Sequence, residues 1–157
     1  MLNHPLIFFF YQVNNPWKEI HATARGMRVA PGPGETYGRY FLSLWYELPD
    51  HARAQAALIQ LDAIEHGLLH EVHFSGKFWH IHVTPARVTF TSHQFETWNT
   101  GEHNVFAFHE LRHTILAWDA FLALPEEPPG TEYSFPMPDG SDTKPTLHRY
   151  NRENTTV

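Results

Sequence analysis

Two stretches of the chain carry apolar residues at helical spacing, and the other apolar segments have the lengths of β-strands. Pro49 and Asp50 open the first helical stretch, with Asp50 placed to cap its free amides and Gly67 placed to end it. Its apolar residues recur every three or four positions and form one stripe: Ala54, Ala57, Leu58, Leu61, Ile64 and Leu68. A second helix is expected over residues 108–124, and Pro125, the next residue, ends it. Its core stripe comprises Leu111, Ile115, Trp118 and Leu122.

The remaining apolar segments predict strands. Residues 6–13 form an apolar, aromatic run with the length of a buried strand, and residues 39–48 predict a second strand rich in aromatic and branched side chains. Residues 14–29 fit either a short helix or a strand. A meander of three strands is expected over residues 69–92, with a tight turn at 75–77. On its middle strand Trp79, Ile81 and Val83 share one face, and Phe78, His80 and His82 share the other.

This order of elements predicts an α+β fold, in which two amphipathic helices pack on an antiparallel sheet of about four to six strands. The 157 residues suffice for one domain, which we assign to residues 1–125. Pro and Gly alternate over residues 30–35, which therefore form a loop. Half of the 12 prolines lie in residues 125–157, so residues 126–157 are predicted to be an extended or partly disordered tail.

Composition narrows the function classes. The chain has no Cys, which excludes disulfides and thiolate metal sites and favours a reducing compartment. Its N-terminus lacks the basic start and cleavage site of a secretory signal, and its apolar run is too short for a bilayer, so we expect a cytoplasmic protein without membrane contact. A net charge of −6 disfavours nucleic acid as partner and fits a basic protein better. The chain has neither a Gly-rich phosphate loop nor a nucleophile elbow, and we expect no cofactor.

The run His109-Glu110-Leu111-Arg112-His113 spells the zinc-ligand signature H-E-x-x-H near the start of the second helix. Two histidines four apart on a helix can bind one zinc ion, with the intervening Glu110 as general base of a metallopeptidase. The third ligand is missing at the usual spacing, and the downstream candidates Glu132 and His148 lie in the predicted tail. With 13 histidines, such a motif is expected by chance in about one sequence in fifteen. We therefore prefer surface histidines to a zinc peptidase.

A second histidine group lies in the meander. His80 and His82 alternate on one strand face, with His70 and His73 on the neighbouring strand, and strand spacing of this kind can build a histidine metal site. His70 and His73 differ in parity, so both cannot join the same face without a bulge. A half-exposed sheet face in a histidine-rich protein is the preferred interpretation.

The residue order of several segments also resembles a known class of proteins. These segments are Tyr40-Phe41-Leu42-Ser43-Leu44-Trp45, Val72-His73-Phe74, Trp79-His80-Ile81, Val88-Thr89-Phe90, Phe95-Glu96, Phe106-Ala107-Phe108-His109-Glu110-Leu111 and Leu116-Ala117-Trp118-Asp119-Ala120-Phe121-Leu122. Strands followed by a helix with an Ala-Trp-x-x-Phe-Leu core, over roughly residues 38–125, resemble the small immunity proteins of bacterial contact-dependent growth inhibition and other polymorphic toxin systems.

The resemblance implies a role without catalysis, namely tight binding of a cognate toxin domain in the cytosol. Many such toxins are basic nucleases, which an acidic partner complements. Charge and expected exposure indicate the contact candidates, which are Glu96, Trp98, Glu102, Glu126 and Glu127. For Trp98 the alternative is a buried loop anchor, and for the four glutamates it is an ordinary solvated surface.

Overall fold

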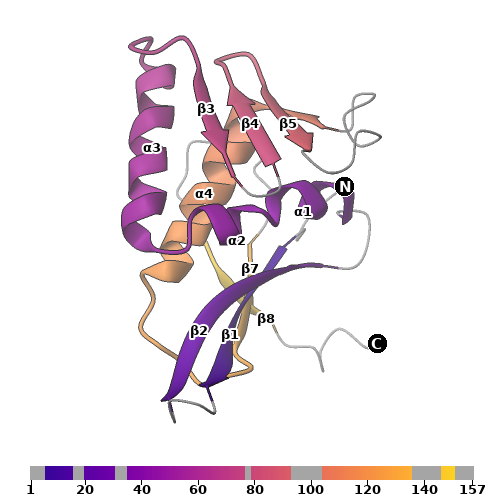
Figure 1. The fold of residues 1–157 in the computed structure, drawn as a ribbon, viewed down its shortest axis with the longest axis vertical. Coiled ribbons are helices and arrows are strands. Elements are labelled where there is room, and N and C mark those ends of the chain that lie inside the picture. The colour runs from indigo at the N-terminus through magenta and orange to yellow at the C-terminus, as the bar shows by residue number, and fades with distance from the viewer. Residues whose placement is uncertain are drawn as a thin grey trace.

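The computed structural model describes residues 6–15, 20–30, 35–76, 79–92, 104–135 and 146–150. Over these ranges the chain forms two antiparallel four-stranded sheets together with helices, which confirms the predicted α+β class. The sequence led us to expect one sheet, and the strands instead divide between two. Figure 1 shows the two sheets at opposite ends of the molecule, with short helices between them and two long helices beside the second sheet.

The first sheet has the order β2-β1-β7-β8. Its strands are β1 (Leu6–Asn15), β2 (Ile20–Val29), β7 (Glu132–Ser134) and β8 (His148–Tyr150). The strand predicted over residues 6–13 is confirmed as β1, and the ambiguous stretch before residue 30 contains a strand, β2. Residues predicted to be an extended tail supply β7 and β8, and β7 pairs directly with β1.

The second sheet has the order β3-β4-β5-β6. Its strands are β3 (Val72–Ser75), β4 (Trp79–Val83), β5 (Val88–Ser92) and β6 (Val105–Phe106). The predicted meander is confirmed, and Trp79, Ile81 and Val83 form the buried face of β4. Of the turn predicted at 75–77, the last residue lies outside the described ranges, as does Phe78.

Both long helices are confirmed, as α3 (His51–Glu65) and α4 (Phe108–Leu122). The carboxylate of Asp50 caps α3 by accepting a hydrogen bond from the Arg53 backbone N–H at 2.8 Å. The predicted α3 stripe is buried except for Leu68, which is 79% exposed. The helix ends before it, and Gly67 has a φ of 75° that favours glycine. None of the helices in the described ranges combines the length and apolarity needed to cross a bilayer.

The strand predicted over residues 39–48 is wrong. These residues lie in and around the short helices α1 (Glu35–Phe41) and α2 (Leu44–Glu47). Their aromatic and branched content suggested β-structure, but the buried positions Tyr40, Phe41, Leu44 and Leu48 recur at helical spacing. Of the loop predicted over 30–35, Glu35 belongs to α1, and residues 31–34 lie outside the described ranges.

One aromatic core joins the two sheets. On the side of the first sheet, the ring of Phe8 in β1 lies 5.2 Å from Trp118 and 5.4 Å from Phe121, both in α4. On the side of the second sheet, the rings of Phe41 and Phe90 lie 5.0 Å apart. Since all five side chains belong to one buried cluster, the sheets are halves of a single packed unit.

Gly26 in β2 allows a close approach that a larger residue would prevent. A Cβ atom at this position would lie 2.9 Å from the Phe9 ring and 3.1 Å from the Trp45 ring. We therefore expect Gly26→Ala to displace one of these rings and lower the free energy of unfolding by about 1 kcal/mol. Urea unfolding followed by circular dichroism measures the change. Gly130→Ala is not a suitable control, because Gly130 has a φ of 96°, so Ala86→Gly in an exposed turn serves instead.

Candidate functional site

The H-E-x-x-H motif forms the first turns of α4, and its glutamate has a structural contact. Glu110 Oε2 accepts a hydrogen bond from the Ala107 backbone N–H at 2.9 Å, which satisfies one of the free amides at the helix start. Leu111 is fully buried, whereas His109 is exposed and His113 half-buried. Glu110 thus contributes to the helix cap at the position where a peptidase would use it as general base.

The two downstream candidates for a third ligand lie in the first sheet. Glu132 is buried in β7, where its Oε2 accepts hydrogen bonds from Arg28 at 2.7 Å and 3.0 Å. His148 lies in β8. Among the residues the structure describes, the group of three side chains close enough to hold one metal ion is Glu71, His73 and His82, which includes none of the motif residues.

Of the five toxin-contact candidates, Glu126 and Glu127 are within the described ranges. Glu126 is exposed. Glu127 is half-buried, and its carboxylate accepts hydrogen bonds from Tyr133 at 2.5 Å and Arg149 at 2.6 Å, so it ties the segment after α4 to β7 and β8. Glu96, Trp98 and Glu102 lie outside the described residues. The structure therefore leaves Glu126 as a surface candidate and gives Glu127 a structural contact.

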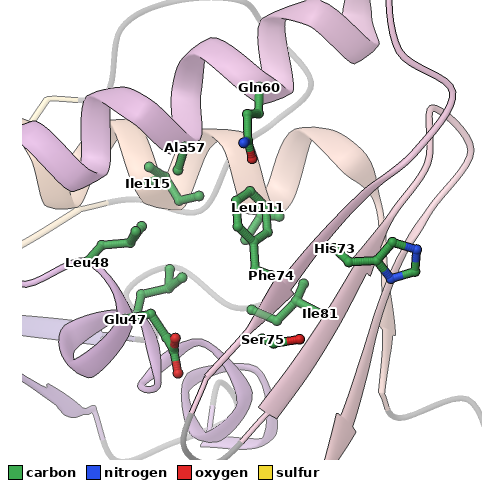
Figure 2. Close-up of a pocket in the computed structure, with 11 residues that line it drawn as sticks. Glu47, Leu48, Ala57, Gln60, His73, Phe74, Ser75, Ile81, Leu111 and Ile115 are labelled. Atoms are coloured by element: carbon green, nitrogen blue, oxygen red, sulfur yellow. The ribbon is translucent and has the colours of Figure 1, made fainter.

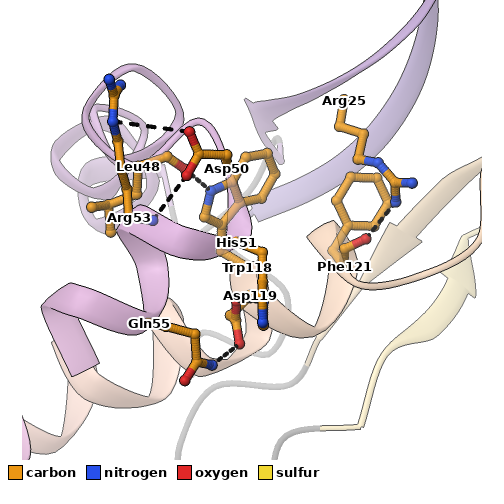
Figure 3. A network of polar contacts seen from close by, with 9 residues as sticks. All are labelled: Arg25, Leu48, Asp50, His51, Arg53, Gln55, Trp118, Asp119 and Phe121. Atoms are coloured by element: carbon orange, nitrogen blue, oxygen red, sulfur yellow. Dashed lines mark hydrogen bonds and ion pairs between the residues drawn. The ribbon is translucent and has the colours of Figure 1, made fainter. Parts of the chain in front are cut away.

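A polar network links the start of α3 to α4 (Figure 3). The buried carboxylate of Asp119 forms two hydrogen bonds with α3. Its Oδ1 lies 2.5 Å from His51 Nδ1, and its Oδ2 accepts a hydrogen bond from the Gln55 side-chain amide at 2.6 Å. Beside it, the Trp118 indole N–H donates to the Leu48 carbonyl oxygen at 2.6 Å. Through these hydrogen bonds, Trp118 and Asp119 of α4 hold this helix against α3 and the residues just before it.

A cavity of about 300 Å³ lies between these helices and the second sheet (Figure 2). Its wall combines apolar residues, among them Leu48, Ala57 and Ile115, with the polar residues Glu47, Gln60, His73 and Ser75. Glu47 reaches Gly76 so closely that a side chain at Gly76 would overlap its carboxylate. The His73 ring points away from this cavity in Figure 2. The cavity borders the second sheet at His73 and Ser75, which also belong to its lining.

The side of α3 that faces away from the core is also apolar. Ala52, Ala56, Ile59 and Ala63 recur at helical spacing opposite the buried residues, and we call them the outer stripe. Ala52 and Ala56 are exposed, and Ile59 is 68% exposed. Figure 1 shows α3 at the edge of the molecule. A helix that is apolar on both sides is typical of one covered on both sides, so the outer stripe has the character of a contact surface.

The solvent side of the second sheet gathers polar side chains, which we call the histidine face. His73 and His82 are direct partners across β3 and β4, and Ser75 and His80 are the next such pair along the same face. The face comprises Glu71, His73, Ser75, His80, His82, Thr89 and Thr91. The predicted sharing of one face by His80 and His82 is confirmed. His70 lies before β3 and is not part of the cluster.

Three hydrogen bonds and one ion-pair contact connect the side chains of the histidine face. His82 Nε2 lies 2.8 Å from Glu71 Oε2, and His73 Nε2 lies 3.6 Å from Glu71 Oε1. His73 Nδ1 lies 2.9 Å from His80 Nε2, and His80 Nδ1 lies 2.9 Å from Ser75 Oγ. The hydrogen bond with His82 lowers the pKa of Glu71 below its usual range, and the contact with His73 contributes in the same direction.

Glu71 is the residue of this cluster that the sequence did not identify as a candidate. It precedes β3 by one position and shares the face of His73 because side chains two apart along extended chain point the same way. Extending the alternation of β3 by one residue would have found it. The sequence had suggested a site of histidines alone, and the structure adds a carboxylate to it.

The chain matches no protein-family model, no curated protein and no solved structure. The residues and their contacts therefore carry the functional assignment. Two surfaces of the described part have a chemistry beyond packing, namely the outer stripe of α3 and the histidine face. The first fits an apolar contact with another protein, and the second offers nitrogen and oxygen ligands on a rigid sheet.

Proposed function

We propose that this protein is an immunity-type inhibitor, which binds a basic toxin domain in the cytosol and has no catalytic activity of its own. The observation that carries the proposal is the outer stripe of α3, where Ile59 is 68% exposed, next to the exposed Ala56 and the half-buried Ala63. Isolated exposed apolar residues are common on protein surfaces, but a stripe along a whole helix is typical of an interaction site. Leu68, just beyond the helix, is a second strongly exposed apolar residue, at 79%.

Charge supports a basic partner. The chain carries 17 acidic against 11 basic side chains. Several arginines are already engaged by the protein itself: Arg25 binds carbonyl oxygens, Arg28 binds Glu132, and Arg112 lies between Asp62 and Glu65. A protein with this balance attracts a basic domain over distances of about a Debye length and repels nucleic acid. An apolar contact surface on an acidic protein is the combination that an inhibitor of a basic nuclease needs.

Co-expression tests the function directly. The product of the gene immediately upstream is expressed in a bacterial host as the candidate toxin, with and without the chain. We expect growth arrest without the chain and normal growth with it, and the same rescue by a His109→Ala/His113→Ala variant, because the H-E-x-x-H motif takes no part in inhibition. A neighbouring product that is harmless, or toxicity that the chain does not relieve, would contradict the proposal.

Ile59→Lys is expected to weaken toxin binding by at least roughly 30-fold, the effect of a central contact residue at an interface. Lysine preserves the helix, places a charge in the apolar contact and is repelled by a basic partner. Calorimetric titration with a catalytically inactivated toxin domain measures the dissociation constant. Val13→Lys is the matched control, because Val13 is 41% exposed but lies in the first sheet.

Two results of this titration would count against the contact surface. Equal affinities for the Ile59→Lys and Val13→Lys variants would mean that the outer stripe does not touch the toxin. Affinity for the unaltered chain that does not fall between low and high salt would mean that charge complementarity makes no contribution.

A further inference from the structure

We propose that the histidine face binds one zinc ion through Glu71, His73 and His82, and that His80 is a positioning residue for His73. This site is separate from the H-E-x-x-H motif and from the outer stripe of α3. The ligand set of two imidazoles and one carboxylate occurs in zinc enzymes with a further position open to water. Hard ions such as Mg²⁺ and Ca²⁺ prefer oxygen ligands alone, so the nitrogen donors favour a transition metal.

The backbone places the three ligands in advance. His73 and His82 are cross-strand partners, and Glu71 lies two residues before His73 on the same face. One ligand atom from each lies within 4.8 Å of the other two. Since β3 and β4 are hydrogen-bonded strands of a four-stranded sheet, little chain entropy remains to be lost when a metal ion binds.

One of the two histidine–glutamate ligand distances already fits a tetrahedral ion, and the other is shorter than such an ion allows. Zinc with ligands at about 2.0 to 2.2 Å separates neighbouring ligand atoms by about 3.3 to 3.6 Å. The distance from His73 Nε2 to Glu71 Oε1 is 3.6 Å. The distance from His82 Nε2 to Glu71 Oε2 is 2.8 Å, which is a hydrogen bond and must lengthen when a metal ion replaces the shared proton. The rings of His73 and His82 are nearly parallel, with centroids 4.4 Å apart, and both present Nε2 to the same carboxylate.

His80 can hold His73 in the tautomer that zinc needs. If His73 Nδ1–H donates to His80 Nε2, and His80 Nδ1–H donates to Ser75 Oγ, both 2.9 Å contacts are satisfied. His73 Nε2 then carries no proton, and its lone pair is directed to the Glu71 side. Metal-binding histidines usually donate their second ring N–H in this way, and loss of the acceptor weakens metal affinity by about 10-fold to 100-fold.

Zinc titration of the full-length chain, first freed of metal with a chelator, tests the site. We expect one equivalent of zinc sulfate to bind near pH 7, where imidazole is largely neutral, with a dissociation constant below about 10 μM. His73→Ala and His82→Ala should each weaken binding by at least about 100-fold. Glu71→Gln should weaken it by at least about tenfold, and His80→Ala by about 10-fold to 100-fold. Zinc should raise the melting temperature of the unaltered chain but not of the His82→Ala variant.

The His109→Ala/His113→Ala variant is the matched control, because it removes the same number of imidazoles from another surface, and it should bind zinc as the unaltered chain does. All these side chains face solvent or lie near it, and Glu71→Gln preserves shape, so melting without zinc verifies that each variant is folded. Absence of one saturable equivalent would overturn the proposal. So would binding that persists without His73 and His82, or that disappears without His109 and His113.

Discussion

Trp118→Ala is expected to lower the free energy of unfolding by about 3 to 5 kcal/mol, the usual cost of removing a large aromatic side chain from a core. Trp118 is fully buried in α4. Its ring packs against Phe8 of the first sheet at 5.2 Å and against Phe121 at 5.6 Å. The side chain thus fills the point where α4 meets the first sheet, and its removal leaves a cavity that rigid neighbours cannot close.

Trp118→Phe separates the packing from the hydrogen bond. Phenylalanine retains an aromatic ring but leaves the Leu48 carbonyl oxygen without the indole N–H that lies 2.6 Å away, and we expect a loss of about 1 to 3 kcal/mol. Urea unfolding followed by circular dichroism gives both values. His109→Ala, on the exposed side of the same helix, should change stability by less than about 0.5 kcal/mol. A similar loss for Trp118→Ala and His109→Ala would show that this part of the core carries little of the stability.

The parts of the fold that the sequence predicted are those whose burial repeats locally. The stripes of α3 and α4 and the alternation of Trp79, Ile81 and Val83 can be read from neighbouring positions, because each element buries one side against the core. Asp50 marks the start of α3 by a contact with Arg53 three residues away. Such short-range signals need no knowledge of the partner element.

The parts that were missed depend on distant partners. Tyr40 and Phe41 look like strand residues, and they are helical because α1 and α2 pack between the two sheets, where ring contacts with Phe90 and Phe106 override local preference. Strand β7 was missed for a similar reason. Its pairing with β1 joins residues more than a hundred positions apart, so the sequence around β7 does not predict it.

The histidine face was predicted in part for the same physical reason. Alternation along β4 placed His80 and His82 together, but the partnership of His73 with His82 depends on the register of β3 and β4. Glu71 then follows from the alternation of β3. The zinc-peptidase hypothesis for His109 and His113 stays a prediction, and the zinc titration with its two sets of histidine variants distinguishes it from the site at Glu71.

Arg25→Ala is expected to lower the free energy of unfolding by about 3 kcal/mol, from two charge-assisted hydrogen bonds and a cation–π contact, reduced for partial exposure. Arg25 extends from β2 to the end of α4, where it donates to the carbonyl oxygens of Phe121 and Leu124, each at 2.7 Å (Figure 3 shows the first). Its guanidinium lies 4.8 Å from the centroid of the Phe10 ring. The positive charge of Arg25 is also attracted by the partial negative charge at the C-terminus of α4, which stabilises the helix end.

Arg25→Lys tests whether the fork of the guanidinium matters beyond its charge. Lysine retains the charge near the helix end but cannot donate to two carbonyl groups in a fixed plane, so we expect it to recover only about 1 kcal/mol of the loss. Urea unfolding measures both variants, and hydrogen exchange at the last turn of α4 reports the local effect. Arg87→Ala, in the exposed turn between β4 and β5, is the control for loss of an arginine. If the lysine variant were as stable as the unaltered chain, the charge alone would account for the contribution of Arg25. Equal losses for Arg25→Ala and Arg87→Ala would mean that the link between the first sheet and α4 contributes nothing to stability.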